Sequence, residues 1–249
     1  MSKILVIGDS CTDIFRYGEV NRLAPEAPIP IIKPERETQN PGMAGNVVAN
    51  LKSLGVNVEF ITNKEEIRKI RYVCSKYNHP LLRVDENENC KRINIEDVLC
   101  AVEWEKYDAI VISDYCKGFL NHLDIEYIAA SHPLTFLDTK RSLGNWADKI
   151  TFIKINYQEF KNNENILLHN QNIFEKTIIT RGKYGCNYKN KNYPTVQVPI
   201  KDVSGAGDTF LAGLVKNYMA TKNIEEAIKF AQDCTTTVVQ KLGVSTITK

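Results

Sequence analysis

The chain has 249 residues, of which 43% are hydrophobic and 25% charged, so it is long enough to bury a full core in one large α/β domain. The formal net charge of +2, with both signs interspersed, gives no indication of binding to nucleic acid or to a membrane surface. No apolar run approaches a membrane span, and the first residues lead into a strand without a signal-peptide core, so we expect a cytoplasmic protein. The seven cysteines are odd in number and include no CxxC pair, and the four histidines lack ligand spacing, which argues against a disulfide framework or a structural metal site.

Five short apolar runs, each ending in a polar cluster, predict strands that are buried on both faces and therefore a parallel sheet covered by helices. They are residues 4–7, 109–112, 134–137, 151–155 and 177–179. Between and after them, helical patterns span residues 44–54, 94–103, 208–218 and 224–239. Ligands of such sheets bind beyond the carboxyl ends of the strands, where the polar clusters collect.

Two segments do not fit the alternation of strands and helices. Residues 15–37 are rich in proline, and residues 69–85 read as two strands that turn near Asn78. Because proline is tolerated on edge strands and not in sheet centres, we expect both segments to form one small sheet beside the main domain. The pattern fits a lid and a dimerising hairpin equally well. The polar stretch 161–172 is predicted to be a loop.

The stretch DVSGAGDTF, residues 202–210, sets a glycine-rich turn against the start of a predicted helix. Exposed N–H groups at a helix start attract anions, and glycines let a phosphate approach the backbone. Asp208 would face that phosphate, where its task would be to accept the proton of an attacking hydroxyl. Taken by itself, so short a motif is better explained as an ordinary loop with Asp208 as a helix cap, so the other motifs of the chain must decide.

Several motifs in the right order resemble those of the ribokinase-like (PfkB-type) carbohydrate kinases. They are PGMAGN (41–46), NYQE (156–159), TRGKYG (180–185), DVSGAGDTFLAG (202–213) and the first strand end with Asp9 and Asp13. The resemblance covers nearly the whole chain. It implies a single kinase domain over residues 1–249, with the ribokinase-like three-layer fold, a mostly parallel central sheet and a small β-sheet lid.

The resemblance also implies roles for individual residues. Asp208 would be the general base, and the backbone of Gly205, Ala206 and Gly207 the anion hole for the transferred phosphate. The substrate-binding residues would be Asp9, Asp13, Gly42, Asn46, Arg83 and Lys140. The nucleotide-binding residues would be Thr180, Gly182 and Gly185, and Asn156 and Glu159 would order Mg²⁺ through water. ATP and Mg²⁺ are the implied cofactors.

Within the family, the segments 20–37, 81–86, SDYCKG and DTKR resemble the kinases that phosphorylate the anomeric hydroxyl of D-glycero-D-manno-heptose 7-phosphate. The expected partners are therefore a small sugar phosphate and ATP, a second copy of the chain through the lid, and a separate nucleotidyltransferase acting downstream, because no such segment follows Lys249. Met43 stands where the family has a small residue, and a helix and strand after Asn63 look missing. Two alternatives stay open: a kinase of a neutral sugar or nucleoside, and a degenerate binding protein that regulates without turnover.

Overall fold

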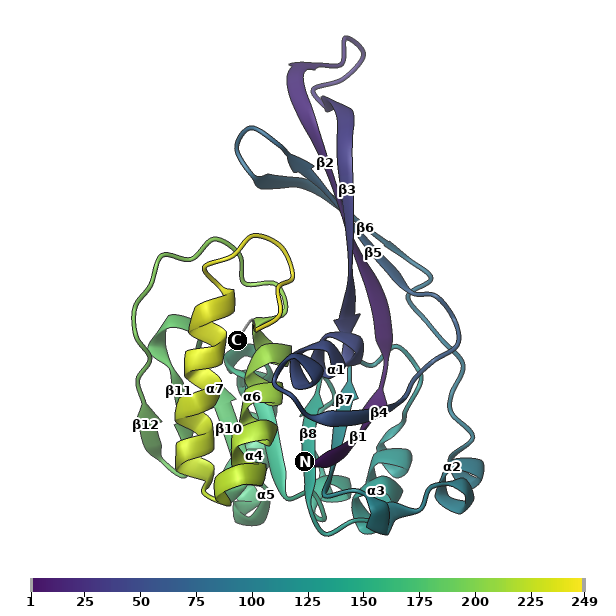
Figure 1. Ribbon diagram of the computed structural model, residues 1–249, viewed down its shortest axis with the longest axis vertical. Coiled ribbons are helices and arrows are strands. Elements are labelled where there is room, and N and C mark those ends of the chain that lie inside the picture. Colours follow the sequence, from purple (N-terminus) through teal and green to yellow (C-terminus); the bar gives the residue numbers. More distant parts are fainter. Residues whose placement is uncertain (1, 248–249) are drawn as a thin grey trace.

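The computed structural model describes residues 2–247, and its main body is built on a sheet of eight strands (Figure 1). Their order is β12-β11-β10-β9-β8-β7-β1-β4. The strands are β1 (Lys3–Gly8), β4 (Asn57–Ile61), β7 (Ala109–Asp114), β8 (Thr135–Thr139), β9 (Phe152–Asn156), β10 (Thr177–Thr180), β11 (Cys186–Tyr188) and β12 (Lys191–Tyr193). The strands from β4 to β10 pair in parallel, whereas β11 and β12 are antiparallel. All five predicted strands and the mostly parallel sheet are confirmed.

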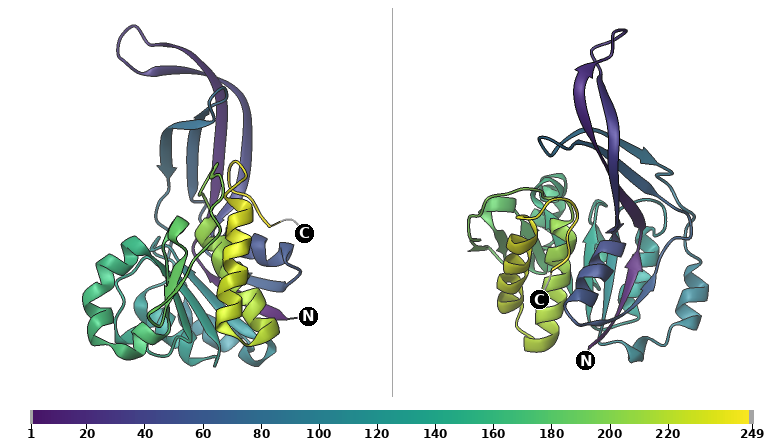
Figure 2. Two further views of the ribbon diagram at one scale, coloured as in Figure 1. Left: turned by 90° about the vertical axis from the view of Figure 1, so that its left-hand side faces the viewer. Right: turned by 45° about the horizontal axis from the view of Figure 1, so that its top comes forward.

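Helices cover both faces of this sheet, as Figure 2 shows. In β1, the side chains of Ile4 and Val6 join one hydrophobic core and those of Leu5 and Ile7 join the other, because successive side chains of a strand point to opposite faces. The first core includes α1 (Ala44–Ser53), α6 (Ala206–Thr221) and α7 (Ile224–Val238). The second includes α2 (Ile95–Ala101), α3 (His122–Ala130), α4 (Tyr157–His169) and α5 (Gln171–Glu175). The sheet is therefore the middle of three layers, with a core on each side.

The predicted loop over residues 161–172 is wrong, since α4 and α5 occupy almost all of it. The helix α4 begins with a capping box, in which the Asn156 side chain accepts from the backbone N–H of Glu159 and the Glu159 side chain accepts from that of Asn156. Its buried face carries Asn163, whose amide nitrogen donates to the carbonyl of Glu159 and whose oxygen accepts from the N–H of Leu143. A polar residue on the buried face hides the helical period, so composition alone suggested a loop.

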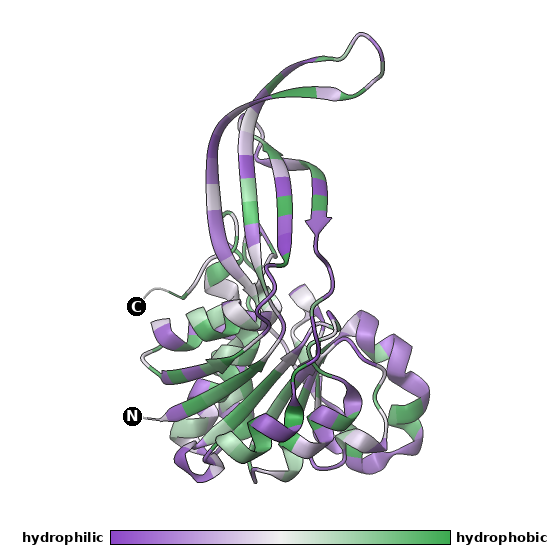
Figure 3. Ribbon diagram, turned by 90° about the vertical axis from the view of Figure 1, so that its right-hand side faces the viewer, coloured by the Kyte–Doolittle hydropathy of each residue, from purple (hydrophilic) through white to green (hydrophobic). Residues whose placement is uncertain are grey.

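A second sheet of four strands projects from the main body (Figure 1). We call it the small sheet; its order is β3-β2-β5-β6, with β2 (Ser10–Leu23), β3 (Pro30–Met43), β5 (Arg68–Cys74) and β6 (His79–Glu86). Three prolines lie in β3 and one in β6, which are the two edge strands. The small sheet predicted from residues 15–37 and 69–85 is thus confirmed, with strands that extend beyond those bounds. Figure 3 shows alternating hydrophilic and hydrophobic bands along its strands, as expected for a sheet with unlike faces.

The crossings between the two sheets are short. Strand β1 continues into β2 after Asp9, β3 continues directly into α1, and only residues 62–67 separate β4 from β5. No helix or strand intervenes between β4 and β5, as the sequence indicated. Among residues 2–247, no helix combines the length and apolarity needed to cross a bilayer.

Candidate active site

The glycine turn before α6 brings backbone N–H groups and a carboxylate to one place. Gly205 has φ 78°, and a Cβ at this residue would lie 2.5 Å from the Asn46 amide nitrogen, so the position requires glycine. The helix begins at Ala206, and its first N–H groups have no partner within the helix. Asp208 is the third residue of α6, on its first turn. The turn therefore sets helix-start N–H groups beside a carboxylate, an arrangement that suits an anion.

The Asp208 carboxylate is held by two donors from other elements. Its Oδ2 accepts from the Asn46 amide at 2.9 Å, and its Oδ1 accepts from the Tyr115 hydroxyl at 2.5 Å. The residue is only 4% exposed. Burial raises the pKa of the Asp208 carboxyl from 3.8 to about 6, although the hydrogen bonds from Tyr115 and Asn46 oppose the rise. The carboxylate is ionised at neutral pH and is a stronger proton acceptor than an exposed aspartate.

A buried ion pair lies next to the anion site. The Lys154 ammonium group is 2.7 Å from Asp138 Oδ2, and both side chains are almost fully buried. A Cβ built on Gly207 would be 2.8 Å from Lys154 Nζ, which places this positive charge directly against the backbone of the glycine turn. Burial would raise the pKa of Asp138, but the ammonium groups of Lys154 and Lys140 hold it below its ordinary value. An anion bound at the turn would therefore meet a fixed lysine charge.

The two aspartates predicted to bind sugar hydroxyls are placed differently. Asp9 is fully buried, and its carboxylate accepts from the backbone N–H groups of Tyr115 at 2.6 Å and Phe119 at 3.2 Å. Asp13 is on β2, where its carboxylate pairs with the Arg71 guanidinium and lies against Gly42, at which any Cβ would collide with Asp13 Oδ2. Asp13 is therefore better placed for a ligand than Asp9, which fastens the loop after β7.

The predicted magnesium pair forms the capping box of α4. The Glu159 carboxylate accepts from the N–H and the amide of Asn156, each at 2.7 Å, and also contacts the Lys140 ammonium group. Lys140 Nζ lies 3.6 Å from Asp138 Oδ1, an oxygen without a hydrogen-bond partner among the described residues. Carboxylate oxygens suit Mg²⁺, so Asp138 and Glu159 fit a cation held through water. Within residues 2–247, no cluster of three or more His, Cys, Asp or Glu side chains forms a ready metal site.

The two basic residues predicted to bind the substrate, Arg83 and Lys140, do not lie in one place. Arg71 and Arg83 are paired residues of β5 and β6, and they line a cavity of about 570 Å³ beneath the small sheet. Lys140, by contrast, lies between Asp138 and Glu159. Arg141 is tied to Asp114, with 2.8 Å between Nε and Oδ2. Only the two arginines of the small sheet are thus placed together around this cavity.

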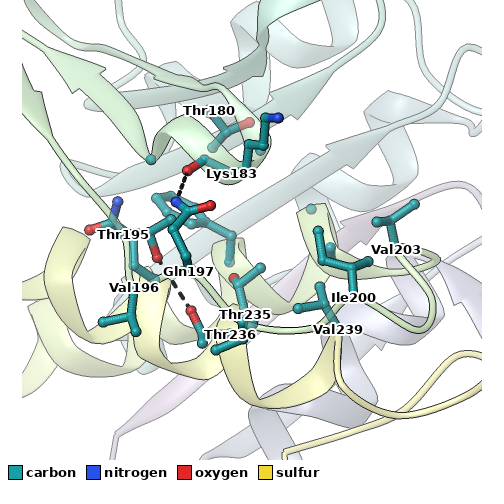
Figure 4. Close-up of a pocket in the computed structure, with 17 residues that line it drawn as sticks. Thr180, Lys183, Thr195, Val196, Gln197, Ile200, Val203, Thr235, Thr236 and Val239 are labelled. Carbon is teal, nitrogen blue, oxygen red and sulfur yellow. Dashed lines mark hydrogen bonds between the residues drawn. The ribbon is translucent and has the colours of Figure 1, made fainter.

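The predicted nucleotide contacts Thr180, Gly182 and Gly185 line a second cavity, of about 190 Å³ (Figure 4). Its other walls are mainly apolar and come from the segment 195–203 and from α7. The segment is fastened by the Gln197 amide, which donates to the Lys183 carbonyl at 2.6 Å. Ala206 and Gly207 form the end of this cavity next to the anion site. An apolar slot that ends at backbone N–H groups suits a nucleotide with its base inside and its phosphates at the turn.

Sequence reasoning did not single out Tyr115, Lys154 or Asp138 as site residues. A signal was present for Lys154, because a lysine inside the apolar run of β9 is rarely buried without a partner. Tyr115 and Asp138 follow or end buried strands, and their partners are far away in sequence, so only the fold brings them to Asp208 and Lys154.

Comparisons with known proteins place the chain in a family. Residues 117–249 match the family described as pfkB family carbohydrate kinase. The Bifunctional protein HldE of Vibrio atlanticus (strain LGP32) is 29% identical over 99% of this chain, and that of Vibrio parahaemolyticus serotype O3:K6 (strain RIMD 2210633) is 27% identical. The chain spans 62% of the length of both relatives. The alignment with the first covers 295 positions, so that relative carries residues that this chain of 249 lacks.

Solved structures show the same fold at low identity. Phosphofructokinase-2 from Escherichia coli superposes with a TM-score of 0.74 at 13% identity, covering 100% of this chain and 96% of that one. The nucleoside kinase of Methanocaldococcus jannaschii, an archaeal member of the ribokinase family, gives a TM-score of 0.71 at 18% identity, with 98% and 93% covered. The predicted ribokinase-like fold is confirmed.

Proposed function

Because this chain belongs to the pfkB family of carbohydrate kinases, we propose that it transfers the γ-phosphoryl group of ATP to the anomeric hydroxyl of D-glycero-D-manno-heptose 7-phosphate. The observation that carries the proposal is the place of the glycine turn just before Asp208: Ser204 lines the cavity beneath the small sheet, and Ala206 and Gly207 line the apolar slot. The segment around Val203 contributes to both the apolar slot and the cavity beneath the small sheet. A nucleotide in the first and a sugar in the second would meet at Asp208.

The chemistry follows from the charges at this point. A sugar hydroxyl is too weak an acid to lose its proton beforehand, but the proton can move late, as the bond to phosphorus forms. Asp208 accepts it, and the N–H groups of Gly205, Ala206 and Gly207 hold the transferred group, for which the Ala206 N–H would release the Val203 carbonyl, to which it donates at 3.2 Å. The buried Lys154 ammonium group adds a positive charge there that needs no reorganisation during the reaction. Positioning and electrostatics therefore supply most of the rate enhancement.

ATP would be bound with Mg²⁺, which neutralises charge on the phosphates when it is present. Asp138 and Glu159 are the carboxylates that fit it, through water, and Asn156 orients Glu159. Lys140 contacts both carboxylates and holds them close together.

Two features support a phosphorylated heptose as the acceptor. The first is the pair of arginines, Arg71 and Arg83, that lines the cavity beneath the small sheet. Their guanidinium groups suit a phosphate at the end of the sugar remote from the reacting hydroxyl. The second is the similarity to the HldE proteins along 99% of the chain, which includes the segments that resemble heptose-phosphate kinases.

A kinase of a neutral sugar or nucleoside is the second candidate. It is favoured by the pairing of both arginines with carboxylates, Arg71 with Asp13 and Arg83 with Asp85. Met43 also favours this candidate. It is buried, at φ 56°, where the family has a small residue, and its side chain packs beside Cys11 and Ile67. A smaller sugar would fit a narrowed site.

Phosphate transfer from ATP and magnesium to a panel of acceptors separates these candidates. The panel contains heptose 7-phosphate, unphosphorylated heptose, ribose and a nucleoside. We expect heptose 7-phosphate to have the highest kcat/KM and to yield a bisphosphate modified at the anomeric position. Equal or better turnover of the neutral acceptors would replace the heptose-phosphate assignment by the second candidate.

We propose that the small sheet is a lid over the acceptor site. Its buried apolar residues are divided between small clusters, one of Phe15, Tyr17 and Val73 and another that includes Cys11 and Met43, so its local stability should be low. Amide hydrogen exchange is expected to be fastest in residues 15–37 and 69–85 without substrate and to slow there when acceptor and nucleotide bind. Equal exchange in both states would instead favour a fixed dimerisation element.

A further inference from the structure

Tyr115 is held at both ends, its backbone and its hydroxyl, by aspartate carboxylates. It follows β7, and its backbone N–H donates to Asp9 Oδ2 at 2.6 Å. Its hydroxyl donates to Asp208 Oδ1 at 2.5 Å. Since Asn46 donates to the other oxygen, the carboxylate is clamped from two sides. A carboxylate held in this way cannot rotate without breaking a hydrogen bond to an ionised group, and such bonds are stronger than those between neutral groups.

The ring of Tyr115 lies within reach of two ammonium groups. Lys69 Nζ is 5.3 Å from the ring centroid, and Lys140 Nζ is 5.0 Å from it. Lys69 is a buried residue of β5, in the small sheet, whereas Lys140 contacts Asp138 and Glu159 at the candidate cation site. Both contacts are attractive, because the face of an aromatic ring is negative. The tyrosine therefore touches the small sheet, the candidate cation site and the carboxylate.

We propose that Tyr115 is a positioning residue that holds the Asp208 carboxylate in its reactive orientation and transmits the position of the small sheet to it through Lys69. The inference rests on the proposed role of Asp208 as the base. If the small sheet moves, Lys69 moves with β5, and the ring and its hydroxyl follow. Movement of the lid would then change the orientation and proton affinity of the base as well as the access of water.

The charged groups around the pair define what a substitution would do. Asp208 faces the Asn46 amide from α1, Asp138 from β8, Lys140 after β8, Lys154 from β9 and the Cys11 thiol from β2. Tyr115 faces Lys69, Lys140, Asp138, Glu159 and Asp208. Burial and the neighbouring Asp208 carboxylate raise the pKa of the Tyr115 phenol well above its ordinary value, so it remains a donor throughout the neutral range. Its hydrogen bond favours the ionised form of Asp208, and its loss would favour the protonated form.

The test is the pH dependence of kcat for Tyr115→Phe between pH 5 and pH 9. Removing the hydroxyl should raise the pKa of Asp208, so the acid limb of the profile should move up by about one pH unit. The variant should lose far more activity at pH 6 than at pH 8. Tyr127→Phe is the matched control, because Tyr127 is 51% exposed on α3, and its profile should not move. If the acid limb of the Tyr115→Phe profile does not move, the inference is overturned, even if the melting temperature or KM of the variant has changed.

A double-mutant cycle with Lys69→Met tests the link to the small sheet. Lys69→Met alone should move the acid limb in the same direction by a smaller amount, and it should have no further effect in a Tyr115→Phe background. Additive effects would mean that Lys69 acts on Asp208 without the tyrosine, which contradicts the proposed link. Asp208→Asn, measured alongside, separates the two hypotheses: retained activity in that variant refutes the proposed base, whereas its inactivity with an unmoved Tyr115→Phe profile refutes only the positioning role.

Discussion

Replacing Asp208 with asparagine is expected to lower kcat by about a hundred- to ten-thousandfold while leaving the fold intact. Asparagine has nearly the same shape and can keep hydrogen bonds to Asn46 and Tyr115, whose hydroxyl can accept as well as donate. It cannot accept the proton of the acceptor hydroxyl. Steady-state kinetics with ATP, together with nucleotide-binding measurements, would show whether turnover alone is lost. A variant with near-normal kcat would refute the role of Asp208.

The same substitution should make the protein more stable at pH 8. The pKa of the Asp208 carboxyl is raised from 3.8 to about 6 in the folded state, so ionising it there costs up to about 3 kcal/mol. A raised pKa means that this cost is fully present above pH 6 and absent below pH 3.8, where the carboxyl is protonated in both states. Thermal melts should therefore show a gain for Asp208→Asn at pH 8 that shrinks between pH 6 and pH 4. Loss of stability at pH 8 would mean that the carboxylate serves the fold.

The arginines of the small sheet should determine how strongly a phosphorylated acceptor is preferred. A charge-assisted hydrogen bond contributes about 1.5–3 kcal/mol, so Arg83→Met should lower kcat/KM for heptose 7-phosphate about ten- to hundredfold. Two such bonds favour the phosphorylated over the neutral sugar by roughly two to four orders of magnitude, and Arg71→Met combined with Arg83→Met should remove most of this preference. Values for the unphosphorylated heptose should change little with Arg83→Met.

The control for this experiment is Arg68→Met. Arg68 is also on β5, but it is half-exposed, pairs with Glu66 and does not line the cavity. It should leave the preference between the two sugars unchanged. The ratio of kcat/KM values is the informative quantity, because Arg71→Met also leaves the Asp13 carboxylate without its partner and could weaken both sugars alike. If Arg83→Met leaves the preference for the phosphorylated sugar unchanged, Arg83 does not bind the phosphate of the acceptor.

The parts of the fold that could be predicted from the sequence are those with a clear period. The run 109–112 is buried on both faces, and residues 44–54 repeat apolar side chains at helical spacing. The helix α4 failed this criterion because Glu159 and Asn163 occupy its buried face. In the small sheet, the prolines identified the edge strands. The predicted segment began too late, at residue 15, because β2 follows β1 after a break of one residue and the sequence does not mark where it begins.

The site divides in a similar way. Asp208 and its glycines are contiguous in sequence, and one helix start places them, so the turn could be predicted. The partners of Asp208 come from α1 and from the end of β7, and no local pattern links Asn46 to Tyr115. Lys140 was predicted to act with Arg83, but the structure places it with Asp138 and Glu159, because the end of β8 lies beside that of β9. Such pairings depend on strand order, which the sequence does not state.

The chain passes from the main sheet into the small sheet twice, from β1 to β2 and from β4 to β5, and this affects the order of folding. Strands β2 and β5 pair in parallel, from Thr12 with Arg68 onwards, although α1, β3 and β4 lie between them in the chain. Closing so long a loop is costly unless its ends are already close. The pairing of β1 with β4 in the main sheet supplies that closeness, since Ile7 and Ile61 are partners immediately before both crossings. The main sheet should therefore form first, and the residues of the small sheet that face the acceptor should join the site only in the last step of folding.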